Sequence, residues 1–300
     1  MRKIKIRLPA TLTDFGPGLH GLGLALALHT TVEISGRRDD LLRVELRGQG
    51  ILDEATALQH PVVLAMSRFF QHIERTHLGI DIRVQNDIPL QSGLGAEAAL
   101  TLAGVLGANN LMGDLYDRDD ALEIAAVISR ADATVASILG GLAVGVLEDE
   151  TLIYRSLPVS PIELIVVVPK LEEFQSTTVP DQISREAAIR NVARIPLVID
   201  ALRTGDMHLL AGVLDGGIIN SRTASGISGF AHVKEIAERR GALKLVAAGS
   251  GPAVIALAES RHDIIAEDIV LAFKSVGIEA QSWVLPVDTQ GVVISIAQSA

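Results

Sequence analysis

The sequence contains no cysteine and few aromatic residues, and each shortage excludes something. Without cysteine there are no disulfides, no thiolate nucleophile and no cysteine-ligated zinc or iron–sulfur site. Aromatic residues make up 3% of the 300 residues, so the core has to be built from Leu, Ile, Val and Ala. With 48% hydrophobic and 21% charged residues, the composition is that of a globular protein.

The chain also lacks an excess of positive charge and any long apolar run. A net charge of −10 argues against a nucleic-acid-binding surface, although backbone N–H groups at a helix N-terminus can still hold a phosphate. The longest uncharged stretch of note, residues 133–147, is too short to span a bilayer. Residues 1–9 lack the apolar segment of a signal peptide. We therefore expect a cytoplasmic protein with neither a nucleic-acid nor a membrane partner.

The spacing of apolar residues predicts a mixture of strands and helices, which is typical of an α+β fold. Two prolines within residues 156–161 indicate a boundary, so we divide the chain into domains 1–158 and 159–300. Strands are predicted over 4–8, 22–34, 41–46, 80–84, 142–147, 152–157, 164–168 and 253–258, with two more at the end of the chain. Helices are predicted over 60–77, 96–111, 119–129, 133–139, 181–204, 206–214, 231–240 and 264–275.

Three glycine-rich loops carry the functional signal. The first, Gly16-Pro17-Gly18-Leu19-His20-Gly21, formally matches the G-x-G-x-x-G of dinucleotide-binding proteins. That motif requires a helix to begin at the loop, whereas residues 22–34 have the pattern of a strand. The dinucleotide interpretation fails for this reason, and a tight turn and a ligand-binding loop stay open as alternatives.

The second loop, Gln91-Ser92-Gly93-Leu94-Gly95, runs directly into a series of helix-forming residues. Gly93 and Gly95 allow the backbone to approach a ligand closely, and the N–H groups of the first helical turn favour an anion such as a triphosphate. It is not a Walker loop, because no Lys-Ser or Lys-Thr follows. The alternative is a helix start that merely contains glycine.

The third loop is Gly249-Ser250-Gly251-Pro252. Proline directly after Gly251 forces a turn that leads into a predicted strand. Taken alone, a simple turn explains this loop as well as a ligand does.

In this order, the three loops resemble the motifs of the homoserine kinases, a family within the GHMP kinases. Residues 9–26 are similar to the first motif, Gly93-Leu94-Gly95 with Ala98-Ala99 to the phosphate loop Gly-Leu-Gly-Ser-Ser-Ala-Ala, and Gly249-Ser250-Gly251-Pro252 to the third motif. Weaker matches are Arg130-Ala131-Asp132, and Asp215 with Arg222 seven residues later. The matches from residue 9 to residue 258 cover most of the chain.

The resemblance implies a two-domain α+β kinase, with an N-terminal domain like the second domain of ribosomal protein S5 and a ferredoxin-like C-terminal domain. It implies transfer of the γ-phosphoryl group of ATP, with Mg²⁺, to the hydroxyl of L-homoserine, and a homodimer. Asp14, His20, Asp132 and Arg222 would lie at the acceptor, with Asp14, Asp132 and Arg222 taking part in catalysis. The nucleotide would be bound by Gly93, Leu94, Gly95, Ala96, Glu97, Ala98, Gly249, Ser250 and Gly251.

Several positions depart from the family pattern. Ala96 and Glu97 replace the paired serines of the phosphate loop, and Asp14 replaces an Asn expected beside the acceptor hydroxyl. His20 replaces the acid expected to meet the substrate ammonium group. Because a carboxylate is a better ligand for a hard cation than a hydroxyl, one hypothesis is that Glu97 binds Mg²⁺, a role that Glu123 matches only approximately. The other is that Glu97 only complements the helix dipole.

Three functions therefore stay in view. The first is an active homoserine kinase. The second is a GHMP kinase for another small alcohol, since the ammonium-binding position is changed. The third is a non-catalytic protein of this fold that binds a nucleotide or metabolite; the lost serines favour it, and the retention of all three glycine loops and of Arg222 opposes it.

Overall fold

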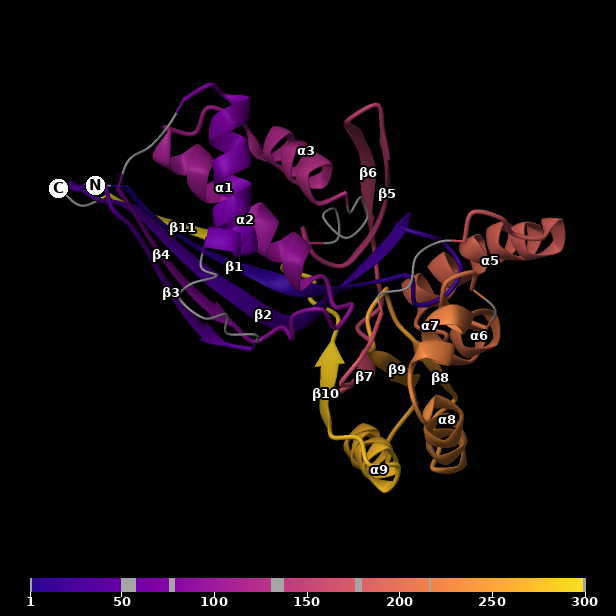
Figure 1. The fold of residues 1–300 in the computed structure, drawn as a ribbon. Helices are drawn as coiled ribbons and strands as arrows, with labels where there is room; N and C mark the ends of the chain where they lie inside the picture. The colour runs from indigo at the N-terminus through magenta and orange to yellow at the C-terminus, as the bar shows by residue number, and fades with distance from the viewer. Residues whose placement is uncertain are drawn as a thin grey trace.

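The computed structural model describes residues 2–49, 58–75, 79–130, 138–175, 180–215 and 217–298. Two parts are visible in Figure 1, one built on strands β1–β4 with helices α1–α3 and the other on strands β7–β10 with helices α5–α9. The first part contains β1 (Arg2–Thr13), β2 (Leu22–Gly36), β3 (Leu42–Gly48), α1 (Pro61–His72), β4 (Ile80–Asn86), α2 (Ala96–Leu111), α3 (Arg118–Ser129), β5 (Leu142–Glu148) and β6 (Thr151–Leu157).

The N-terminal part is a seven-stranded sheet with helices on one face. The main path runs β11-β1-β2-β4-β3, and β5 pairs with the start of β2 and with β6. All the pairs are antiparallel except β3 with β4, which is parallel. Strand β11 (Val293–Gln298) comes from the end of the chain. The last strand of the range 159–300, which we assigned to the second domain, thus lies in the sheet of the first.

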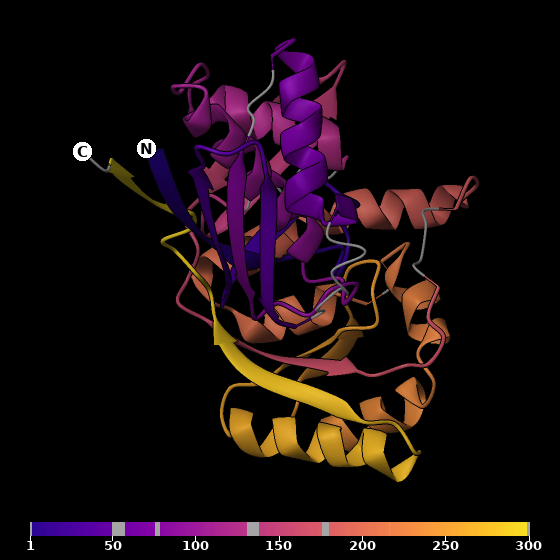
Figure 2. The ribbon, with the colours of Figure 1, turned by 60° about the vertical axis from the view of Figure 1, so that its left-hand side comes forward.

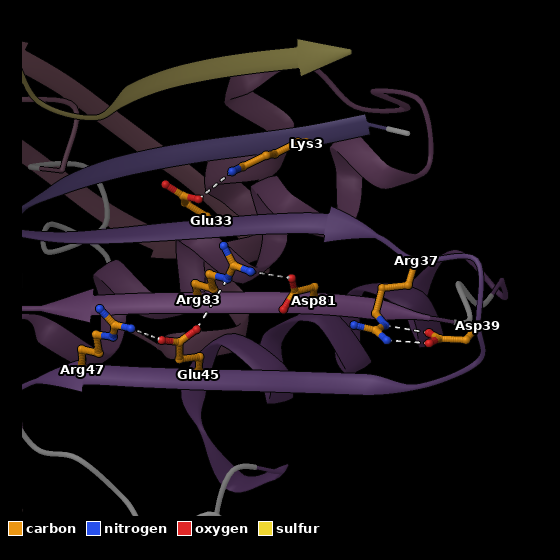
Figure 3. A network of polar contacts seen from close by, with 8 residues as sticks. All are labelled: Lys3, Glu33, Arg37, Asp39, Glu45, Arg47, Asp81 and Arg83. Carbon is orange, nitrogen blue, oxygen red and sulfur yellow. Dashed lines mark hydrogen bonds and ion pairs between the residues drawn. The ribbon is translucent and has the colours of Figure 1, made fainter. Parts of the chain in front are cut away.

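Alternation along the strands explains why this sheet has one apolar and one charged face. Ile4, Ile6 and Leu8 of β1 point into a core shared with α1, α2 and α3. On the open face, Glu33 pairs with Lys3 at 2.8 Å, and further charged pairs extend across the neighbouring strands (Figure 3). Hydrogen bonds from Lys3 and Lys5 lower the pKa of Glu33, so these pairs favour its ionised form.

The C-terminal part is a four-stranded antiparallel sheet with the strand order β10-β7-β9-β8, which is that of a ferredoxin-like fold. Its elements are β7 (Glu163–Pro169), α5 (Arg185–Thr204), α6 (Met207–Val213), α7 (Asn220–Gly226), α8 (Phe230–Arg239), β8 (Lys244–Ala247), β9 (Val254–Leu257), α9 (His262–Ser275) and β10 (Ala280–Pro286). Figure 2 shows α9 lying along β10 at the end of the molecule furthest from α1. The two-domain α+β architecture expected from the sequence is confirmed.

A continuous apolar core joins the two parts. Leu12 and Leu24 of the first sheet belong to the same buried cluster as Val166 and Ile255 of the second. Helices α5 and α6 add to this cluster, whereas α8 and α9 cover the opposite face of the second sheet. The two domains are therefore fixed against each other by packing.

The connection that returns the chain from β10 to β11 is anchored by a buried carboxylate. Asp288 is 2.6 Å from Nε2 of His29 on β2, and its other oxygen accepts the N–H groups of Gln290 and Gly291. Burial opposes ionisation of this carboxyl, but these hydrogen bonds outweigh it and lower the pKa of Asp288. The carboxylate thereby ties the connection between β10 and β11 to strand β2.

Most predicted elements match the structure, but α7 and β8 are not anticipated by the sequence patterns. The seven residues of α7 are mostly small and polar, so they show no apolar stripe. Strand β8 has four residues, which are too few to show an alternation of apolar and polar side chains. The helix predicted over 133–139 falls largely outside the described residues. In the part of the chain that is described, no helix combines the length and apolar character needed to cross a bilayer.

Candidate active site

A cavity of about 1500 Å³ opens between the two domains. The N-terminal domain contributes Thr13, one side of α1, residues 89–93 and the first turn of α2. The C-terminal domain contributes residues 168–172, 250–252 and 279–281, with parts of α9. Ordinary small-molecule sites occupy roughly 300–1,000 Å³, so this cavity has room for a ligand as large as a nucleotide.

The second and third glycine loops form one side of the cavity by packing backbone against backbone. A Cβ atom on Gly251 would lie 2.1 Å from the carbonyl carbon of Ser92, and one on Gly249 would lie 2.6 Å from the carbonyl oxygen of Gly93. The N–H group of Ala253 donates to the carbonyl of Ser92 at 3.0 Å. Glycine is required at these positions because the two loops meet, whatever they bind.

Helix α2 begins at this junction without a side-chain cap. Gly95 is its N-cap in the left-handed region, with φ of 69°, and no described side chain accepts from the first turn. Side chains cap the starts of α1, α3, α5 and α6, whereas α7, α8 and α9 also begin without a side-chain cap. Among these uncapped starts, that of α2 is the one that lines the cavity. The first N–H groups of a sixteen-residue helix thus face a large cavity, an arrangement that favours an anion.

Of the predicted nucleotide-binding residues, Gly93, Gly95, Ala96, Glu97, Ala98, Ser250 and Gly251 line the cavity. The side chain of Leu94 is fully buried, and its carbonyl accepts the N–H of Thr11 in β1 at 3.0 Å. Leu94 therefore anchors the second loop to the sheet. Sequence reasoning missed Ser92, whose hydroxyl donates to the carbonyl of Pro89 and lies 3.3 Å from the N–H of Leu94. Its position just before the paired glycines was the available signal.

In the first loop, the structure brings Asp14 and His20 together. The N–H of His20 donates to Oδ1 of Asp14 at 2.7 Å, and Nδ1 of the His20 ring lies 3.1 Å from Oδ2. Both residues have φ of +53°, although neither is glycine. Such backbone strain persists only where the surroundings impose it, and it is frequent at functional sites. The Asp14 carboxyl group is buried, and the His20 side chain is about half exposed.

Asn220, at the start of α7, links the first loop to the third, and sequence reasoning did not find it. Its Nδ2 donates to the carbonyl of Asp14 at 2.9 Å and to that of Ala247 at 2.7 Å. Ala247 ends β8, two residues before Gly249. Through Asn220, the loop that carries Asp14 is fixed to the loop that packs against Gly93. No periodicity or motif marks an isolated Asn of this kind.

The other residues predicted to lie at the acceptor make fewer contacts with the first loop, or lie outside the described residues. Arg222 is exposed on α7, two residues after Asn220. Asp215 pairs with Lys244 and, at 3.8 Å, with Lys234. Asp132 lies outside the described residues. The structure therefore joins Asp14, His20 and the start of α7 but gives no geometry for Asp132.

The two predicted metal ligands lie in different environments. Glu97 is exposed in the first turn of α2 and lines the cavity. Glu123 on α3 is not among the cavity residues; its carboxylate accepts the N–H of Leu152 at 2.9 Å. Across the described residues, no group of three or more His, Asp or Glu side chains is arranged to hold a metal ion. Mg²⁺ commonly takes one or two carboxylates together with substrate phosphates and water, and Glu97 fits that requirement.

Other charged side chains in the cavity wall were not predicted. Arg68 on α1 donates from Nη1 to the carbonyl of Ile128 at 3.1 Å, and Lys170 and Lys274 line the side formed by the C-terminal domain. At the other end of α1, His60 is buried in its N-cap position, and burial lowers its pKa to about 4. Glu172 and Glu279 line the same side, so with Glu97 the wall of the cavity carries both cations and carboxylates, and a neutral imidazole caps the helix beside it.

Comparison with known proteins identifies the fold and the family. The profile of the GHMP kinases N terminal domain matches residues 60–141. A homoserine kinase from Synechocystis sp. is 30% identical over 305 residues, covering 98% of this chain and 99% of that protein. A homoserine kinase from Carboxydothermus hydrogenoformans is 28% identical over 280 residues, covering 92% and 91%.

Comparison with solved structures gives the same family as the sequence comparison. The crystal structure of homoserine kinase from Cytophaga hutchinsonii superposes with a TM-score of 0.79 and 26% identity, covering 98% of this chain and 97% of that one. Mevalonate kinase from L. major shares the fold, with a TM-score of 0.68 at 15% identity. Since the similarity extends over nearly the whole of both chains, the protein belongs to the homoserine kinase family of the GHMP kinases.

Proposed function

We propose that this protein transfers the γ-phosphoryl group of ATP to the hydroxyl of L-homoserine, giving O-phospho-L-homoserine and ADP. The observation that carries the proposal is the uncapped start of α2 at Gly95, which faces a cavity between the domains beside two interlocked glycine loops. The full-length similarity to homoserine kinases supports the same activity and a small-molecule substrate.

The residues of the phosphate side bind and orient the triphosphate. The N–H groups of the first turn of α2 lack a side-chain partner and would donate to phosphate oxygens, and the α2 dipole would add to their effect. Because these donors are fixed before the reaction, they stabilise the charge that spreads over the transferred group without reorganising. The bond between the γ-phosphorus and its bridging oxygen breaks, a bond to the acceptor oxygen forms, and the hydroxyl proton is released.

We assign Mg²⁺ to the same side, with Glu97 as its protein ligand. When bound, the metal neutralises phosphate charge during transfer. Glu97 is the acidic residue nearest in sequence to the α2 donors, and its exposed carboxylate lines the cavity. Glu123 would act only indirectly, because its carboxylate is engaged by β6.

The acceptor is assigned to the first loop and α7, which adjoin the cavity at Thr13, although Asp14, His20 and Arg222 are not themselves lining residues. Asp14, His20 and Arg222 come from these segments, and the catalytic role expected of Asp132 and Arg222 remains part of the proposal. A guanidinium is well suited to a substrate carboxylate. Asn220 holds the backbone carbonyl of Asp14, and the backbone N–H and ring of His20 hold its carboxylate, so both parts of Asp14 are fixed.

One observation favours a second candidate, a kinase for another small alcohol. His20 stands where the family pattern has an acid, and it also engages Asp14, so this loop presents less negative charge to an ammonium group. His20→Asp discriminates the two. If residue 20 faces the ammonium group, the variant lowers the KM for L-homoserine; an acceptor without an amine would gain nothing from the change.

The experiment is an ADP-release assay with purified protein, ATP and a panel of acceptors: L-homoserine, L-serine, L-threonine and amine-free short alcohols. Turnover selective for L-homoserine is the expected result. Turnover selective for an amine-free alcohol supports the second candidate. Nucleotide binding without turnover on any acceptor contradicts both. We also propose that the enzyme is cytoplasmic and works as a homodimer, as the resemblance implies.

A further inference from the structure

Lys170 directly follows strand β7 and lines the cavity. Along β7, Val166 and Val168 belong to the core that joins the two domains, whereas Ile165 and Val167 face the helices α8 and α9. Because side chains alternate between the two faces of a strand, Lys170 continues the row of Val166 and Val168. Its side chain therefore points toward the N-terminal domain, at the place where the shared core gives way to the cavity.

The neighbouring strands place Lys170 beside the third glycine loop. Strand β7 lies between β9 and β10 (Figure 1), and its pairing with β9 extends to Val167, which lies opposite Val254. The same register, continued for three more residues, brings Lys170 beside Gly251, the residue of the third loop that packs against the second. On its other side, the N–H of Lys170 donates to the carbonyl of Glu279 at 2.7 Å. The backbone of Lys170 is thus fixed next to the two loops at the start of α2.

The ammonium group of Lys170 is available to a ligand. The side chain is exposed, and among the described residues no carboxylate lies within ion-pair distance of its Nζ. Glu279 is its neighbour across the strands and Glu172 follows two residues later in the chain; both are exposed and line the cavity, but neither pairs with it. A lysine that faces a large cavity without a partner of its own is suited to an anion.

The charge at the start of α2 calls for such a cation. Ala96 and Glu97 stand where the phosphate loop of the family has two serines, so this chain lacks two hydroxyl donors and gains a negative charge. The dipole of α2 contributes only about half an elementary charge, and a bound Mg²⁺ offsets only part of the charge of a triphosphate. Of the other cations in the wall, Arg68 already donates to the carbonyl of Ile128. Lys170 lies beside the glycine loops and is uncommitted.

We propose that Lys170 is a phosphate-binding residue, which contacts the β- and γ-phosphates of ATP from the C-terminal domain while α2 binds them from the N-terminal domain. A charge-assisted hydrogen bond from its ammonium group holds the triphosphate, and it also stabilises the charge that spreads over the transferred group. The inference rests on the proposed function, which supplies ATP as the ligand. The position of the residue on β7 and its lack of a partner are independent of the acceptor.

Lys170→Met tests the contact through nucleotide binding, because it keeps most of the aliphatic chain and removes the charge. Isothermal titration calorimetry with ATP and with AMP, both with Mg²⁺, gives the two affinities. We expect the Kd for ATP to rise about tenfold or more and that for AMP to change by less than about twofold, since AMP lacks the outer phosphates. Lys170→Arg should keep most of the affinity for ATP. Lys5→Met, the same change on the open face of the first sheet, is the matched control and should bind ATP like the wild type.

Turnover and stability separate this role from others. With saturating ATP, kcat should also fall about tenfold or more in Lys170→Met and recover in Lys170→Arg. If Lys170 only supports the pairing of β7 with β10, the variant loses stability in urea but binds ATP like the wild type, which would overturn the proposal. An equal loss of affinity for ATP and AMP would overturn it too. A wild type that binds ATP but phosphorylates no acceptor contradicts the proposed function, and the difference between ATP and AMP still decides the role of Lys170.

Discussion

Gly251 lies so close to the second glycine loop that a Cβ atom on it would be 2.3 Å from the backbone nitrogen of Gly93. The two residues are 158 positions apart and belong to different domains. Their contact, with the hydrogen bond from Ala253 to Ser92, makes the two loops a single unit at the start of α2. The site therefore depends on the relative placement of the domains as well as on each loop.

Gly251→Ala should disrupt this unit. A methyl group there meets backbone atoms that cannot move aside, so we expect a loss of at least about 3 kcal/mol in the free energy of unfolding, or local opening of the loops with loss of nucleotide binding. Gly212→Ala in α6 is the control, because nothing lies within 4 Å of its added Cβ atom. Denaturant unfolding and fluorescent-nucleotide titration measure both effects. Equal behaviour of the two variants would show that the loops do not require the close contact.

Glu97→Gln tests the metal assignment. The change keeps the size and polarity of the side chain but removes the charge, so we expect kcat with Mg²⁺ to fall by about a hundredfold or more. Binding of ATP in the absence of Mg²⁺ should be unchanged or slightly tighter, since a negative charge near the phosphates is removed. If Glu97 acts only on the helix dipole, the rate stays near that of the wild type and only stability changes, by less than about 1 kcal/mol.

Asn220→Ala removes both bonds that connect the first loop to the third. Two buried carbonyl groups, those of Asp14 and Ala247, lose their donor, and we expect the protein to lose about 2–3 kcal/mol of stability. Because Asp14 is then less well positioned, kcat should fall more than the affinity for ATP. The neighbouring Ser221→Ala is the control, since Ser221 is exposed. A variant that loses stability but keeps kcat would show that Asn220 has no influence on the acceptor side.

Acid should destabilise the protein through His60. The unfolded chain binds a proton at this residue near pH 6.5, whereas burial lowers the pKa of His60 in the folded protein to about 4. Between these values the unfolded state holds more protons, so the free energy of unfolding decreases as the pH falls, by roughly 3 kcal/mol in total. Asp288, whose pKa is lowered, adds a further loss only at lower pH, as its carboxylate is protonated.

His60→Asn separates this effect from others. Asn is a good N-cap, so α1 should keep its start, but the residue no longer titrates. The free energy of unfolding measured in urea should then vary less between pH 6.5 and pH 4 than in the wild type. Gln71→Asn, a change to a non-titrating side chain at an exposed position of α1, is the control for the substitution itself and should leave the pH dependence unchanged. Equal slopes for all three proteins would contradict the assignment to His60.

The sequence predicted much of this architecture because its signals are local. Helix α2 has its predicted bounds, since Gly95 and Gly113 flank a run dominated by Ala and Leu, although Gly104 and Gly107 lie within it. The alternation of Ile4, Ile6 and Leu8 similarly indicated β1 and its buried face. What it could not indicate is that β11 returns to pair with β1, because strand pairing between residues nearly 300 positions apart leaves no local pattern.

The sequence likewise predicted some parts of the candidate site, those with a local motif, and not the parts that depend on contacts between distant segments. The glycine loops were recognised from their spacing, but the reason for their glycines, contact between the loops, required the fold. Asn220 and the pairing of Asp14 with His20 depend on turns in which both Asp14 and His20 have positive φ, which neither residue type signals. Glu123 resembled a metal ligand in residue type and approximate position, yet its carboxylate accepts a hydrogen bond from the backbone of Leu152 in β6.

Phosphorus NMR of the reaction products tests the central claim most directly. The purified protein is incubated with ATP, Mg²⁺ and L-homoserine, and the spectrum is followed against samples lacking the acceptor. The account predicts that the γ-phosphate resonance of ATP is replaced by that of a phosphate monoester coupled to two methylene protons, equal in amount to the ADP formed. ADP formed only with free orthophosphate, or no reaction despite bound ATP, would contradict it.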